Sequence, residues 1–104
     1  MTDLLAMVEE RLGEVGVRLT ATTGGQALCR LDGHTASSKE LEGRMAVLLE
    51  VRRALRKDPQ ADITEIADRW RADLKRRRAA GDSVSWLAYL AGGLAEVDQL
   101  LARN

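Results

Sequence analysis

Few side chains in this sequence are of the types that commonly do chemistry. The only histidine, His34, lies in a predicted link between structural elements, and the only cysteine, Cys29, alternates with apolar residues in a predicted strand. That alternation indicates a buried thiol rather than a nucleophile. One histidine and one cysteine are too few for the usual zinc ligand sets. We therefore predict no catalytic residues, no cofactor and no metal site.

Carboxylates could also act in pairs as general acids and bases, but their spacing here has a simpler explanation. Several lie four residues before an arginine, as Glu40 does before Arg44, which is the ordinary ion-pair spacing of a solvated helix face. The Gly24-Gly25 pair does not open a predicted helix, so it does not resemble a phosphate-binding loop. The sequence therefore predicts a protein that is not an enzyme.

Basic side chains gather at residues 52–57 and 75–78, and these clusters could contact nucleic acid. Each cluster occupies the last turns of a predicted helix, where cations also stabilise the helix dipole without any ligand. No turn follows residues 62–70, so a helix-turn-helix is not predicted. The possible nucleic-acid contacts are Arg18, Arg30, Arg52, Arg53, Arg56, Lys75, Arg76, Arg77 and Arg78.

The charges of the 104-residue chain cancel overall but are unevenly spread. Residues 51–78 carry ten basic and five acidic side chains, whereas both flanking segments are acidic. Such asymmetry can mark a polyanion-binding face, or it can let two copies meet with complementary fields. The single cysteine, the acidic N-terminal segment and the absence of a long apolar run predict a cytoplasmic protein with no membrane contact. The excess of arginine over lysine is typical of a bacterial or phage coding bias.

The hydrophobic pattern predicts one domain over residues 1–104, of the α+β class but mainly α, in the order α-β-β-α-α-α. Apolar residues at helical spacing predict helices over 1–16, 38–57, 62–80 and 83–102. Gly16 is expected to stop the first helix. Apolar residues then alternate from Val17, which predicts a β-hairpin over 17–32 with a three-residue turn at 23–25.

The segment 83–102 is apolar around most of its circumference, which indicates burial on nearly all sides. The chain contains no phenylalanine and only three aromatic residues, so we expect it to need a partner surface to cover this helix. Gly92-Gly93 is costly within a helix but allows another backbone to come close. An intrachain explanation, in which the glycines accommodate a tryptophan of the same chain, stays open. The predicted protein interface comprises Trp86, Tyr89, Leu90, Gly92, Gly93, Leu94, Val97 and Leu100.

These observations predict a small non-enzymatic cytoplasmic interaction protein, such as an adaptor, inhibitor or regulatory subunit. We expect it to form a homo-oligomer, a dimer, through its C-terminal helix, or to bind another protein. The alternative is a DNA-binding regulator of bacterial or phage type that uses the basic clusters at 52–57 and 75–78.

Overall fold

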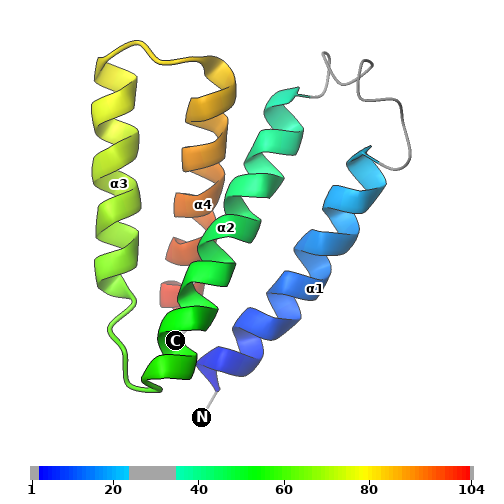
Figure 1. Ribbon diagram of the computed structural model, residues 1–104, viewed down its shortest axis with the longest axis vertical. Helices are drawn as coiled ribbons and strands as arrows, with labels where there is room; N and C mark the ends of the chain where they lie inside the picture. The colour runs from blue at the N-terminus through cyan, green and yellow to red at the C-terminus, as the bar shows by residue number, and fades with distance from the viewer. Residues whose placement is uncertain (1–2, 24–34, 104) are drawn as a thin grey trace.

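The computed structural model describes residues 3–23 and 35–103, and the regular structure within these two ranges is entirely helical (Figure 1). The helices are α1 (Leu4–Thr23), α2 (Thr35–Lys57), α3 (Thr64–Ala79) and α4 (Val84–Arg103). The predicted α+β class is therefore wrong, and the fold is an all-α bundle of these four helices. The described helices contain none long and apolar enough to cross a membrane.

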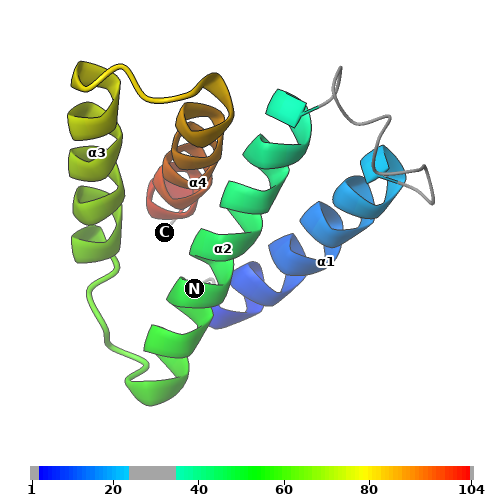
Figure 2. The ribbon, with the colours of Figure 1, turned by 45° about the horizontal axis from the view of Figure 1, so that its top comes forward.

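The helices lie in the spatial order α1, α2, α4, α3, which differs from their order in the chain (Figures 1 and 2). The most extensive contact joins α2 to α4; α1 packs mainly on α2, and α3 packs mainly on α4. α2 and α3 are consecutive in sequence but make no extensive contact with each other. This arrangement leaves a groove between α2 and α3, with α4 behind it.

The first strand of the predicted hairpin is in fact the last part of α1, which continues through Gly16 to Thr23. Val15 is fully buried and Leu19 is partly buried against the core, whereas Val17 is 70% exposed. Leu12, Val15 and Leu19 thus continue a helical stripe, and the alternation of Val17 with Leu19 does not mark two faces of a strand. Packing of this stripe on α2 overrides the weak helix-stopping tendency of Gly16.

The rest of the predicted hairpin, including its turn at 23–25 and its second strand, lies mostly among residues 24–34, outside the described residues. Helix α2 begins at Thr35, three residues before its predicted start at Ser38, and ends at Lys57 before Asp58-Pro59 as expected. α3 and α4 agree with their predicted ranges to within two residues at each end.

The turn between α3 and α4 follows directly from the local sequence. Gly81 has φ +72°, which is the left-handed conformation expected of a glycine that ends a helix. The N–H of Asp82 donates to the carbonyl of Arg77, and that of Gly81 to the carbonyl of Arg78, both over 3.1 Å. Ser83 caps α4, because its hydroxyl accepts a hydrogen bond from the N–H of Trp86 at 3.2 Å.

The core between the helices is aliphatic. Its fully buried members include Leu48, Val51 and Val97, and none of the three aromatic residues is among the buried side chains. Two glycines set how closely the central helices approach. A Cβ atom on Gly92 would overlap the backbone of Glu40, and one on Gly43 would overlap the backbone of Tyr89. The crossing of α2 and α4 therefore depends on both glycines.

We expect Gly92→Ala to destabilise the fold by roughly 2 kcal/mol, because overpacking at a helix crossing exceeds the gain in helix propensity. Gly13→Ala is the matched control: a Cβ there meets nothing within 4 Å, so stability should rise by roughly 0.5–1 kcal/mol. Urea unfolding monitored by circular dichroism measures both changes. Equal effects of the two substitutions would contradict a close backbone crossing at Gly92.

Candidate interaction groove

The groove between α2 and α3 is a concave feature with a mixed polar and apolar lining. It contains two adjacent hollows of about 760 and 530 Å³, both of which are lined by Glu50 and Arg69. The larger hollow lies toward the loop between α2 and α3, and the smaller lies toward the N-terminal half of α4. We call them the charged end and the aromatic end of the groove.

At the aromatic end, the three aromatic side chains of the protein form one stack. The ring centroids of Trp70 and Tyr89 are 5.7 Å apart, and those of Tyr89 and Trp86 are 4.9 Å apart. The Arg77 guanidinium lies 4.9 Å from the centroid of the Trp86 ring, within range of a cation–π contact. All three rings are only partly buried. A Cβ on Gly93 would overlap the Trp70 ring, so this glycine makes room for the stack.

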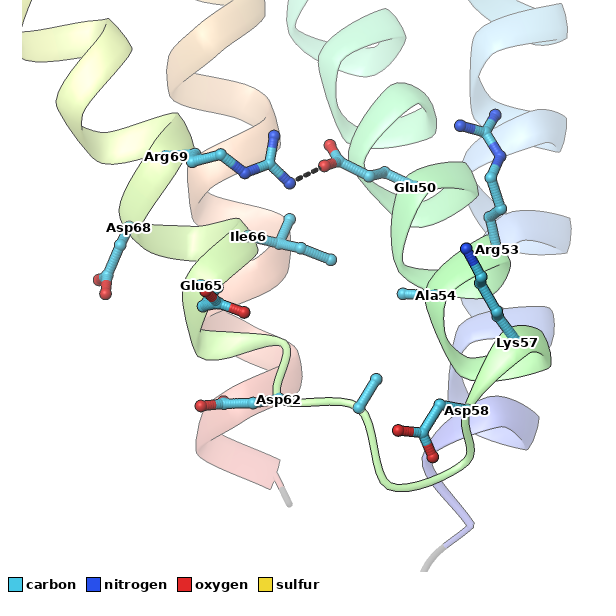
Figure 3. A pocket seen from close by; sticks show the side chains of 11 residues that line it. Glu50, Arg53, Ala54, Lys57, Asp58, Asp62, Glu65, Ile66, Asp68 and Arg69 are labelled. Atoms are coloured by element: carbon cyan, nitrogen blue, oxygen red, sulfur yellow. Dashed lines mark hydrogen bonds and ion pairs between the residues drawn. The ribbon is translucent and has the colours of Figure 1, made fainter.

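Glu50 separates the two ends and ties the opposite walls together. Its carboxylate accepts a hydrogen bond from the indole N–H of Trp70 at 2.9 Å and forms an ion pair with Arg69 (Figure 3). Since Glu50 lies on α2 and both partners lie on α3, this is the bridge that spans the groove. It fixes the edge of Trp70 while leaving the rings beyond it accessible.

At the charged end, the two walls differ in their balance of charge. Arg53 and Lys57 line it from α2, with Asp58 just beyond the end of that helix, whereas Asp62, Glu65 and Asp68 line it from the α3 side, around an apolar interior that includes Ile66 (Figure 3). Hydrogen bonds from the side chain of Thr64 and from its N–H, the latter at 2.9 Å, lower the pKa of Asp62. Arg53, Lys57 and Glu65 form no ion pair within the described part of the chain.

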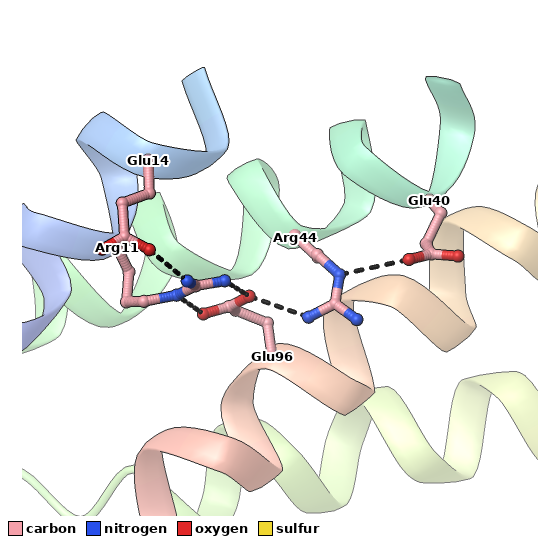
Figure 4. Close-up of polar contacts among 5 residues, drawn as sticks. All are labelled: Arg11, Glu14, Glu40, Arg44 and Glu96. Carbon is pink, nitrogen blue, oxygen red and sulfur yellow. Dashed lines mark hydrogen bonds and ion pairs between the residues drawn. The ribbon is translucent and has the colours of Figure 1, made fainter. Parts of the chain in front are cut away.

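A second polar cluster lies on the far side of α4, where Glu96 is completely buried. Arg11 donates two hydrogen bonds to its carboxylate, at 2.7 and 2.9 Å, and Arg44 donates another at 2.9 Å (Figure 4). Burial by itself raises the pKa of Glu96, but the hydrogen bonds from the two arginines outweigh burial and hold the pKa below its ordinary value. The cluster joins α1, α2 and α4, so its role in this arrangement is to fix α1 on the bundle.

The structure buries most of the predicted protein interface within the chain. Leu90, Val97 and Leu100 are at most 4% exposed, and Gly92 and Gly93 are covered by Glu40 and Trp70 of the same chain. Trp86, Tyr89 and Leu94 remain partly exposed. Of these three, Trp86 and Tyr89 lie at the aromatic end of the groove. An interface at this helix stays a prediction, and its accessible part is this end.

The two basic clusters lie at opposite ends of the bundle, since α2 ends at the bottom of Figure 1 and α3 ends at the top. Several members already have acidic partners: Arg56 pairs with Glu9 at 3.1 Å, and Arg77 pairs with Asp82 at 3.0 Å. Arg76 also pairs with Asp73. Arg18 is an exposed residue of α1 and not part of the predicted hairpin. The other predicted nucleic-acid contacts on α2 and α3 are Arg52, Arg53, Lys75 and Arg78, which are exposed or half-buried.

Arg30, Cys29 and His34 lie outside the described residues. Over residues 3–23 and 35–103, no group of three or more histidine, cysteine or acidic side chains is placed to hold a metal ion. Sequence reasoning missed the roles of Glu50, Arg69 and Glu96. Glu96 did carry a signal, because it is one of only two acids in the apolar helix α4, where a buried charge requires partners.

Comparison with protein-family models, with curated proteins and with solved structures found no match to the chain.

Glu96→Gln should destabilise the protein by about 3 kcal/mol at neutral pH, because it leaves two partly buried arginines without their shared charge. Glu14→Gln removes a half-exposed partner of Arg11 and should cost less than about 1 kcal/mol. Because the folded pKa of Glu96 is lowered, its contribution is complete above the unfolded pKa of about 4.3 and is lost as the pH falls toward the folded value.

The difference in unfolding free energy between wild type and Glu96→Gln should therefore narrow as the pH is lowered from about 6 to 3. Urea unfolding across this range measures it. A difference that stays constant with pH would show that Glu96 acts through its shape alone.

Proposed function

We propose that the protein is a non-enzymatic interaction protein of the cytoplasm that self-associates through the groove between α2 and α3. The aromatic end of the groove is the centre of this contact. Such a protein can serve as an adaptor, an inhibitor or a regulatory subunit. The observation that carries the proposal is the partial exposure of all three aromatic rings in one stack, beside an aliphatic core that contains none of them.

The composition of this surface supports binding to protein. Tryptophan, tyrosine and arginine are enriched among the residues that dominate binding energy at protein interfaces. Here Trp70, Tyr89 and Trp86 lie with Arg76 and Leu90 around one hollow of about 530 Å³. The stack also restrains the rings before binding, which reduces the entropy lost when a partner covers them.

A second copy of the chain is the partner that the charges favour. The formal net charge of the protein is zero, so two copies approach without long-range repulsion. The groove itself carries both signs of charge, as a surface that packs against a copy of itself requires.

Nucleic acid is a poorer fit to the aromatic end of this groove. The two arginines that line this end, Arg69 and Arg76, are paired with Glu50 and Asp73 of the same chain. A phosphate backbone would have to displace these carboxylates and would meet their negative charge. Surfaces that bind nucleic acid gain much of their affinity from cations that are free to replace counterions.

We expect the wild-type protein to show a concentration-dependent monomer–dimer equilibrium in analytical ultracentrifugation. Ala72→Arg adds a long charged side chain to an exposed position that lines the aromatic end, and should weaken association at least about tenfold, or roughly 1.4 kcal/mol. Ala91→Arg is the matched control, because Ala91 is also exposed and helical but lies outside the groove.

A wild-type protein that stays monomeric up to high concentration would contradict the proposal, as would equal effects of Ala72→Arg and Ala91→Arg. Fluorescence anisotropy with a labelled duplex at low salt addresses the nucleic-acid alternative. Salt-sensitive duplex binding that is lost on replacing Arg52, Arg53 and Arg56 by alanine would favour that alternative over self-association.

A further inference from the structure

The charged end of the groove has unused charges of opposite sign on its two walls. Arg53 and Lys57 lie on the α2 wall, followed by Asp58 beyond the end of α2, and Glu65 lies on the α3 wall in the first turn of that helix (Figure 3). All three are exposed, and none forms an ion pair within the described residues. Asp62 adds negative charge to the α3 wall, with one oxygen occupied by the N–H of Thr64. Within the described residues, Arg53 and Lys57 form no ion pair with Glu65 across the groove, although Glu50 and Arg69 pair farther along it.

Two copies related by a two-fold axis parallel to the groove would bring these unpaired charges of opposite sign together. Rotation about that axis places the α2 wall of one copy over the α3 wall of the other, at the same height along the groove. Positive Arg53 and Lys57 then face negative Glu65, and the same contact occurs twice, as two-fold symmetry demands. An axis across the groove would instead place the charged end of one copy on the aromatic end of the other.

The aromatic end favours the parallel axis as well. With that axis, the partly exposed stacks of the two copies meet each other, so each covers the other's apolar surface. Residues that dominate binding energy tend to cluster and to pair with their counterparts in the partner. The charged pairs lie at one end of the same contact, where they set register and exclude wrong arrangements.

We propose that two copies pack face to face about a two-fold axis parallel to the α2–α3 groove, with Arg53 and Lys57 of each copy against Glu65 of the other. This inference rests on the proposed self-association and adds its geometry and its charge pairing. The pairing is reciprocal, so reversing the charge of one wall in both copies creates repulsion twice. Reversing opposite walls in two different copies restores attraction at both contacts.

The test is a charge exchange between walls, followed by sedimentation velocity with one species fluorescently labelled. The first variant is Arg53→Glu with Lys57→Glu, and the second is Glu65→Lys. Each alone should self-associate at least about tenfold more weakly than wild type. An equimolar mixture should form a heterodimer close to wild type in affinity, because both contacts then join opposite charges. Circular dichroism and thermal melting of each variant verify that both are folded.

Matched controls keep the charge changes but move them away from the groove. Lys75→Glu with Arg78→Glu reverses two exposed cations of α3 that line neither hollow, and Glu10→Lys reverses an exposed acid of α1. These controls should associate like wild type. If they are impaired as strongly as the groove variants, net charge rather than wall pairing governs association, and the inference is overturned.

The remaining outcomes separate the inference from the function on which it rests. A monomeric wild type would overturn both. In another outcome, Ala72→Arg disrupts the wild-type dimer, but the charge-reversed groove variants either associate normally or do not regain affinity on mixing. This result would keep the proposed function and overturn the parallel axis.

Discussion

The close crossing of α2 and α4 is the constraint on which the rest of the structure depends. At Gly43 and Gly92 each helix presents bare backbone to the other, so the two axes approach more closely than helices with side chains at the contact. α4 thereby occupies the centre, with α2 on one side, α3 on another and α1 touching it at Glu96. Its apolar circumference is explained by these neighbours. A helix surrounded within its own chain needs no second subunit to cover it.

The same crossing explains why a groove remains. Both α2 and α3 pack on α4, and they make no extensive contact with each other. The chain has no large buried aromatic to fill the remaining space, and its three rings line the opening instead. Glu50 stabilises this opening by binding Trp70 and Arg69 across it. The groove is thus a consequence of core geometry, and its lining determines what it can bind.

Sequence patterns predicted the elements whose ends have strong local chemistry. The helices predicted to end at residues 57 and 80 end at Lys57 and Ala79, because proline restricts the residue before it and Gly81 adopts positive φ. The strand predicted from Val17 was wrong because a short run of alternating apolar residues fits either a strand or a helix. Only the contact with α2 decides between the two. The intrachain explanation for the glycines, that one accommodates a tryptophan, is confirmed at Gly93. The partners of Glu50 and Glu96 could not be predicted from the sequence, because they depend on the order of the helices in space.

Two kinds of charge in this protein have different consequences. The buried Glu96 carboxylate forms ion pairs with Arg11 and Arg44, and these contacts already stabilise the packing of α1 on the bundle. Arg53, Lys57 and Glu65 instead stay hydrated beside an apolar interior, so they gain little from the fold and can gain from a partner. Charged walls around a partly apolar groove, with aromatic rings at one end, resemble the rim and centre of a protein interface. Self-association is therefore supported by the lining of the groove between α2 and α3, and not by the apolar circumference of α4.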